Sequence, residues 1–306
     1  MNKVLRWLLE GDVSINYQVY RDLLDDERPS LRKRIEEEGW GARFLALRKK
    51  DGHWGQGFYR PKWTSTHYTL LDLKNLATPP DNIKVRETIS IILSEEKGQD
   101  GGVNPSKMIK ASDVCINGMF LNYASYFGAP QEEIKSIIDF LIGVQMKDGG
   151  FNCESNRKGA VHSSLHSTIS VLEGINEYKR NNYRYRINEL TKIEPEAVEF
   201  ILQHRLYRSD HTGKTIDKRM LLLSYPSRWR YDIIRALDYF QYADVDYDPR
   251  MRDALEVLVK KRRRSGRWPL QGRHAGKTHF EMEALGEDSR WNTLRALRVL
   301  KKLNHV

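Results

Sequence analysis

A repeat of about fifty residues is the feature that most restricts how this chain can fold. Each copy contains a short Gly turn with a polar or aromatic neighbour, and the copies lie at Asp51–Trp54, Asp100–Gly102, Asp148–Phe151 and Ser265–Trp268. Glycine suits such turns because it adopts the left-handed conformation that ends a helix without steric cost. Self-similarity at this period is typical of helical repeat proteins, in which each unit packs against its neighbours.

A second helix is expected after each turn and its longer polar segment. A pattern with any residue at position i and mostly apolar residues at i+4 and i+7 marks one face of each of these helices. The pattern occurs at 19–23, 69–76, 117–124, 168–175, 233–240 and 293–300. Serine stands just upstream of four of them as a predicted N-cap, at Ser112, Ser164, Ser227 and Ser289. The sequence therefore predicts an all-α chain with two helices per unit.

These repeats predict a single domain over residues 1–306. An atypical first hairpin at 1–26 is followed by hairpins at about 28–77, 81–127, 131–180, 194–243 and 249–303. Two units are close copies, since His211–Thr215 precedes Ser227–Trp229 much as His274–Thr278 precedes Ser289–Trp291. Periodicity alone leaves two arrangements open, an extended solenoid and a closed ring.

The turn with its aromatic residue, followed by Ser or Thr at the start of a helix, resembles the repeat of squalene and terpene cyclases and of protein prenyltransferase β subunits. The best matching segments are VQMKDGGFNCE at 144–154 and KKRRRSGRWPL at 260–270. The resemblance covers nearly the whole chain. It implies an α/α toroid, a ring of about six helical hairpins around a central cavity, with the second helix of each hairpin on the inside.

In such a ring, equivalent positions of the inner helices would face the cavity at one depth. The residue two before the first position of this pattern is aromatic, His or Cys in every unit: Tyr17, His67, Cys115, His166, Tyr231 and Trp291. We expect these side chains to contact a ligand, because aromatic rings suit an apolar or cationic guest. Packing of the same side chains in a core is the alternative.

Basic residues gather in the long segments between turn and inner helix, which a ring would place at one rim. The net charge of +10 also permits an anionic partner. The expected contacts of a phosphate-like head group are Lys214, Lys277, Arg228 and Arg290, with His162 as a further ligand-binding candidate. An ordinary solvated surface is the alternative.

Asp113-Val114-Cys115 is similar to the Asp-x-Cys pair that binds catalytic zinc in protein prenyltransferases. With His166 or His162 as third ligand, this resemblance implies a zinc site with one open position. The match departs from that family, because His166 precedes Ser167 where the family has His directly before Thr, and the family's separate α subunit is not part of this chain. Cys115 could instead be a nucleophile with either His as base, or both Asp113 and Cys115 could be structural.

Other activities lack the residues that they need. The Asp-x-Asp-Asp acid of squalene-type cyclases is absent, since the string at 244–248 has no adjacent Asp pair. Gly276-Lys277-Thr278 lacks the spacing of a phosphate loop, and basic and aromatic residues alternate only at 183–186, which argues against nucleic-acid binding. No apolar run reaches membrane-spanning length. Two cysteines without a secretory signal predict a cytoplasmic location.

The leading functional hypothesis is therefore a prenyltransferase- or terpene cyclase-like protein that holds an apolar, isoprenoid ligand with an anionic head. Transfer of a prenyl group is the reaction that the resemblance implies, and the residues themselves leave open whether any reaction occurs. The alternative is a non-catalytic binding or scaffold protein that docks a peptide or protein partner at the rim.

Overall fold

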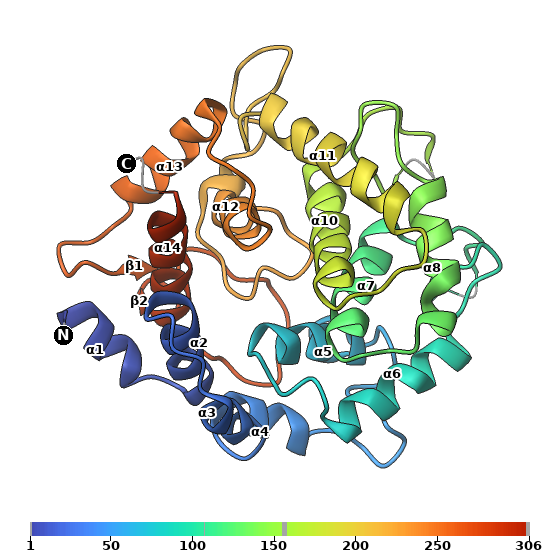
Figure 1. Ribbon diagram of the computed structural model, residues 1–306, viewed down its shortest axis with the longest axis horizontal. Coiled ribbons are helices and arrows are strands. Elements are labelled where there is room, and N and C mark those ends of the chain that lie inside the picture. The colour runs from blue at the N-terminus through green and yellow to red at the C-terminus, as the bar shows by residue number, and fades with distance from the viewer. Residues whose placement is uncertain (1, 107, 155–157, 304–306) are drawn as a thin grey trace. The chain divides into compact units, whose positions relative to one another are not determined.

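The computed structural model describes residues 2–106, 108–154 and 158–303, and it is mainly helical there (Figure 1). The chain divides into two compact units. Unit 1 consists of Met1–Ala46, Asn75–Pro79 and Leu202–Val306, and unit 2 consists of Leu47–Lys74 and Pro80–Ile201. Among the described residues, no helix has both the length and the apolar character needed to cross a membrane.

Unit 1 contains short and long helices and one small antiparallel ladder. Its helices are α1 (Lys3–Leu9), α2 (Val13–Leu23), α3 (Pro29–Lys33), α4 (Gly39–Ala46), α12 (Ile233–Tyr242), α13 (Arg252–Lys260) and α14 (Arg290–Lys302), with 3-10 turns at Arg34–Glu36, Lys218–Leu221 and Pro249–Met251. The ladder pairs β1 (Trp268–Pro269) with β2 (Asp288–Ser289), and Trp268 lies opposite Ser289. It brings the Gly turn at 265–268 to the N-terminus of α14.

Unit 2 is built from longer helices. They are α5 (Thr66–Asn75), α6 (Ile83–Glu95), α7 (Val114–Tyr126), α8 (Gln131–Gly143), α10 (Leu165–Arg180) and α11 (Ile187–Gln203), with a 3-10 turn at Lys62–Thr64; the last residues of α5 and α11 belong to unit 1. Helices α7 and α10 lie side by side and are almost fully buried (Figure 1). A Cβ at Gly118 would lie 2.6 Å from the carbonyl of Ser170, so only glycine permits this approach of the two helices.

The predicted turns are confirmed. Their glycines all have left-handed φ values: Gly52 +83°, Gly101 +85°, Gly149 +87° and Gly266 +81°. The aromatic residue that follows the turn is fully buried in three copies, as Trp54, Phe151 and Trp268. A threonine hydroxyl from the following helix accepts the backbone N–H of that aromatic each time, at 3.0 Å. The repeat is thus a hydrogen-bonded joint between each turn and the helix after it.

Of two predicted N-caps, Ser289 caps its helix and Ser227 does not. Ser289 caps α14 as expected, because its hydroxyl accepts the N–H of Asn292 at 2.9 Å. Ser227 does not cap α12, which begins at Ile233 after Asp232; the carboxylate of Asp232 accepts the N–H of Arg235 at 2.8 Å. A carboxylate beside the helix start is as good a cap as serine, and the intervening residues of the loop are not helical.

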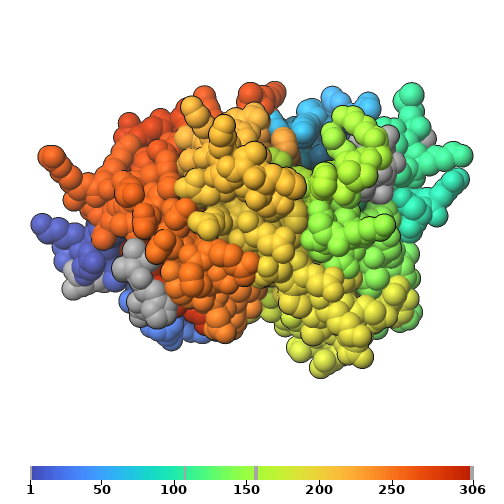
Figure 2. All heavy atoms as spheres, turned by 90° about the horizontal axis from the view of Figure 1, so that it is seen from above, coloured from blue at the N-terminus to red at the C-terminus, as the bar shows by residue number. Residues whose placement is uncertain are grey.

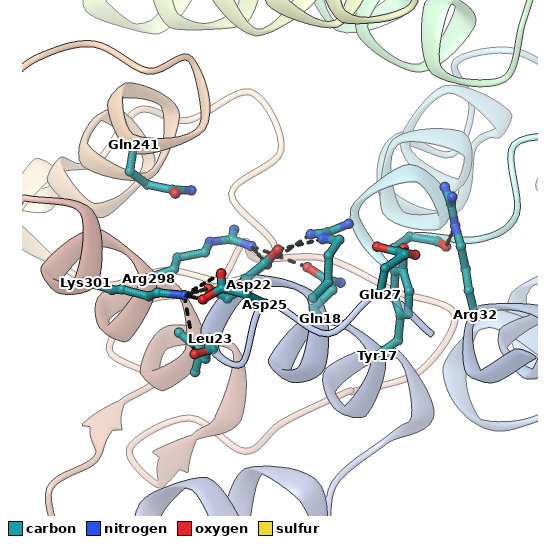
Figure 3. A network of polar contacts seen from close by, with 12 residues as sticks. Tyr17, Gln18, Asp22, Leu23, Asp25, Glu27, Arg32, Gln241, Arg298 and Lys301 are labelled. Carbon is teal, nitrogen blue, oxygen red and sulfur yellow. Dashed lines mark hydrogen bonds and ion pairs between the residues drawn. The ribbon is translucent and has the colours of Figure 1, made fainter. Parts of the chain in front are cut away.

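Ion pairs join α14, at the end of unit 1, to α2 and α12 (Figure 3). Arg298 of α14 donates to Asp22 of α2 at 3.0 Å and to Asp238 of α12 at 2.5 Å. Burial alone would raise the pKa of Asp238, but Arg298 and Arg295 outweigh it and hold that pKa below its usual value of 3.8. The network therefore joins helices that are far apart in the sequence.

Candidate functional site

The residues of the candidate site come from unit 2, where aromatic rings and both thiols of the chain gather. We call this group the aromatic–thiol cluster, and its members are Phe58, Tyr59, His67, Tyr68, Cys115 and Cys153. Tyr59 and Phe58 follow the first Gly turn, and His67 and Tyr68 lie in the first turn of α5. Cys115 lies at the start of α7, and Cys153 lies in the turn that precedes α10.

Tyr59 is the partly exposed residue of the aromatic part. Its centroid lies 5.5 Å from that of His67 and 5.7 Å from that of Tyr68, and the hydroxyls of the two tyrosines are 3.1 Å apart. His67 and Tyr68 are fully buried, whereas Tyr59 is half-buried. One face of Tyr59 is therefore supported by buried rings while part of the side chain meets solvent.

His67 is a neutral imidazole inside the cluster. Its Nδ1 lies 3.2 Å from the hydroxyl of Tyr123, and its buried Nε2 has no hydrogen-bond partner among the described residues. Burial lowers the pKa of His67 to about 3, so the ring carries no charge near neutral pH. Phe58 packs edge-on against the ring at 5.5 Å between centroids.

Cys153 is surrounded by hydrogen bonds that involve both its sulfur and its backbone. Its Sγ accepts the backbone N–H of Cys115 at 3.1 Å and the hydroxyl of Ser167 at 3.4 Å, and its own N–H donates to that hydroxyl oxygen at 3.2 Å. Cys115 is the second residue of α7 and Ser167 the third of α10. The sulfur thus lies at the N-termini of two helices, whose dipoles favour negative charge.

The two thiols affect each other in opposite directions. A hydrogen bond from the Cys115 thiol, followed by those from Ser167 and the Cys115 N–H, holds the pKa of Cys153 below its usual value although burial opposes this. The same hydrogen bond, with burial, raises the pKa of Cys115 well above its usual value. The sequence indicates Cys115 as the candidate nucleophile and a structural role for Cys153, but the hydrogen bonds from the Cys115 N–H and Ser167 favour Cys153 as the thiolate.

Tyr59 joins the aromatic and thiol parts of the cluster. Its pKa is raised chiefly by burial and further by negative charge on Cys115, Asp113 and Cys153, which therefore lie within electrostatic reach of its hydroxyl. Asp113 precedes the first residue of α7 but makes no side-chain capping hydrogen bond there. Tyr59, Asp113, Cys115 and Cys153 are all half-buried residues.

The predicted zinc ligands are not assembled into a metal site. Within the described parts of the chain, no group of three His, Cys, Asp or Glu side chains is placed to hold a metal ion. Asp113, Cys115 and His166 all lie in unit 2, and His166 is half-buried on α10. His162 is exposed in the segment before α10, and its carbonyl accepts from Asn152 at 2.8 Å. Zinc stays a prediction without support from this arrangement.

The predicted aromatic contacts of unit 1 are packed side chains. Trp291 stacks on Tyr225 with 4.6 Å between centroids and lies 6.0 Å from Trp40. Tyr231 is 2% exposed, and Tyr17 is buried with its hydroxyl donating to Glu27 at 2.7 Å. His67 and Cys115 belong to unit 2, so the expected single layer of six side chains involves both units and stays a prediction.

The predicted basic contacts fall into two kinds. Arg290 donates to the carbonyl of Trp7 at 3.1 Å and lies 4.5 Å above the ring of Trp7, and Arg228 is buried at 5% exposure. Arg290 therefore packs against α1, and Arg228 lies in the interior of unit 1. Lys214 and Lys277 are exposed, as expected of residues that could meet an anionic group.

No protein-family model matches the sequence, and no curated protein matches it as a relative. Among solved structures, the chain is similar to a polysaccharide lyase with a TM-score of 0.54 at 12% identity, over 94% of this chain and 86% of that one. It is also similar to the type II terpene cyclase MstE from Scytonema, with a TM-score of 0.49 at 12% identity over 95% and 87%. The likeness confirms the predicted fold class, an all-α chain of the α/α toroid type.

Proposed function

We propose that this chain binds an apolar, isoprenoid-like ligand at the aromatic–thiol cluster, with an anionic head group of the ligand near the start of α7. The observation that carries the proposal is the half-buried ring of Tyr59, which rests on the buried rings of His67 and Tyr68 and adjoins polar groups. A supported aromatic face with polar groups at one edge suits a guest that is apolar along its length and polar at one end.

The polar end of the ligand would be attracted by basic charge in the segment before α7, because the N-termini of α7 and α10 already point at the sulfur of Cys153. Lys110 is exposed in the segment that leads into α7, and the loop after α6 stands out from the surface as the teal segment in Figure 2. The carboxylate of Asp113 opposes an anion at this place, so the head group would lie on the Lys110 side.

Calorimetric titration of the full chain with farnesyl diphosphate and with farnesol tests the proposal. We expect both to bind and the diphosphate to bind more tightly. Tyr59→Ser should weaken both about tenfold, because an aromatic contact contributes roughly 0.5–1.5 kcal/mol beyond its buried area and 1.4 kcal/mol is a factor of ten. Tyr20→Ser makes the same change at a half-buried tyrosine of unit 1 and should leave affinity unchanged.

An acidic oligosaccharide belongs in the same experiment, because one of the similar structures is a polysaccharide lyase. Binding of the oligosaccharide without binding of either isoprenoid would overturn the proposed ligand class. Equal loss of isoprenoid affinity in Tyr59→Ser and Tyr20→Ser would overturn the proposed location.

A further inference from the structure

We propose that Cys115 and Cys153 are a redox-active pair that closes to an intramolecular disulfide by exchange with a small-molecule disulfide. The pair lies in the aromatic–thiol cluster, but the inference goes beyond ligand binding and does not depend on which ligand is bound. It concerns a site of reversible covalent modification in a chain that has two cysteines in all.

The two residues are already in contact, although 38 positions separate them in the sequence. The backbone N–H of Cys115 points at the Sγ of Cys153 from 3.1 Å. Both residues are free cysteines, and each has part of its surface exposed. A disulfide here would join the first turn of α7 to the turn that precedes α10.

Cys153 is the thiol that attacks first. Its sulfur receives a hydrogen bond from the start of α7, which is 13 residues long, and from Ser167 at the start of α10, which is 16 residues long. These donors stabilise the negative sulfur that performs thiol–disulfide exchange. Cys115 lies beside it as the second thiol that resolves the intermediate.

The chemistry balances with one molecule of a small disulfide such as oxidised glutathione. The Cys153 thiolate attacks one sulfur of the reagent, whose S–S bond breaks and releases one thiolate that takes a proton from water. Cys115 then loses its proton to water and attacks Cys153 in the mixed disulfide, and the second small thiol leaves. Two protein thiols are oxidised, and one small disulfide is reduced to two thiols.

The test uses the reduced, full-length protein with oxidised glutathione and mass spectrometry under denaturing conditions. We expect the unmodified sequence to lose two hydrogen atoms and to carry no glutathione. Cys115→Ser should trap one glutathionyl group on Cys153, while Cys153→Ser should react much more slowly. Circular dichroism before and after the reaction confirms that each variant is folded. Each single-cysteine variant then reports on one step, because its remaining thiol can form a mixed disulfide but not the intramolecular bond.

Ser167→Ala removes the hydroxyl that donates to Cys153, so it should slow the first exchange several-fold. Ser170→Ala is its matched control, because Ser170 lies on the same helix and its hydroxyl donates to the carbonyl of His166 at 3.1 Å instead. Two glutathionyl groups on the unmodified sequence, a disulfide-linked dimer, or thiols that stay reduced while the folded protein is exposed to the reagent would each overturn the proposal.

Discussion

Replacing Arg298 by methionine tests whether the ion pairs of Figure 3 stabilise unit 1. Arg298 contacts Asp22 and Asp238, and the exposed fractions of the three side chains are 15%, 17% and 13%. Methionine keeps most of the apolar stem of arginine but removes the charge and its hydrogen bonds. The variant therefore isolates the electrostatic part of the contact between α14, α12 and α2.

The structure sets the size of the expected loss. Removing one partner of a buried pair costs about 3–5 kcal/mol. Arg295 still pairs with Asp238 at 3.1 Å, and Arg21 still pairs with Asp22 at 2.5 Å, so neither carboxylate is left alone. We expect the lower end, about 3 kcal/mol. For a domain of this size, that loss corresponds to a fall in Tm of about 6–12 °C.

The loss should depend on pH. Burial raises the pKa values of Asp22 and Asp238, but Arg298 and the neighbouring arginines hold both below 3.8. A carboxylate whose pKa is lowered in the folded state adds stability above its unfolded pKa, and this stability is lost as pH falls through the folded pKa. The difference between the two proteins should thus be largest near neutral pH and should shrink as pH falls below 3.8.

Thermal unfolding followed by circular dichroism near neutral pH and below 3.8 measures both effects. Lys301→Met is the control, because Lys301 and its partner Asp25 are 42% and 78% exposed and such pairs contribute at most about 1 kcal/mol. Equal falls in Tm for the two variants, or a deficit in Arg298→Met that does not shrink in acid, would refute the reasoning.

Gly118→Ala should destabilise unit 2 by about 1–3 kcal/mol in urea unfolding, because the added methyl would meet the backbone of α10. Gly143→Ala, whose added methyl meets no atom within 4 Å, should be neutral or stabilising by up to about 1 kcal/mol, and equal effects would contradict the packing argument. Between neutral and mildly acid pH, the free energy of unfolding should fall less in His67→Phe than in the unmodified chain. The unfolded imidazole takes up a proton near its usual pKa of 6.5 whereas the folded one resists until about 3, so the unmodified chain loses stability across that window; parallel pH profiles would exclude this role for His67.

The sequence was sufficient for the fold where the signal is local. A Gly turn, a buried aromatic and a Thr-containing helix recur in order, and their hydrogen bonds follow from residues close in the chain. The start of α12 was not predictable in this way. Ser227 and Asp232 are both good caps, and the choice between them depends on how the intervening loop is held.

The candidate site was harder to predict, because its central contact joins distant segments. The pattern at equivalent helix positions identified His67 and Cys115 but not Cys153, which lies in a turn. A signal was nevertheless present: Phe151 is tied to Thr168 by the repeated joint, and Cys153 is only two residues further along. That register places its sulfur near the start of α10, although nothing local indicates that α7 begins there too.

The division of the chain has a consequence for its biosynthesis. Unit 2 ends at Ile201, so all of it has left the ribosome while residues of unit 1 are still being added. This unit can therefore fold while translation continues. Unit 1 folds later, because Asp22 in α2 pairs with Arg298, which lies 276 positions further along the chain. Helix α2 therefore lacks this partner until α14 has been made, and its apolar face is open to chaperones and to aggregation in that interval.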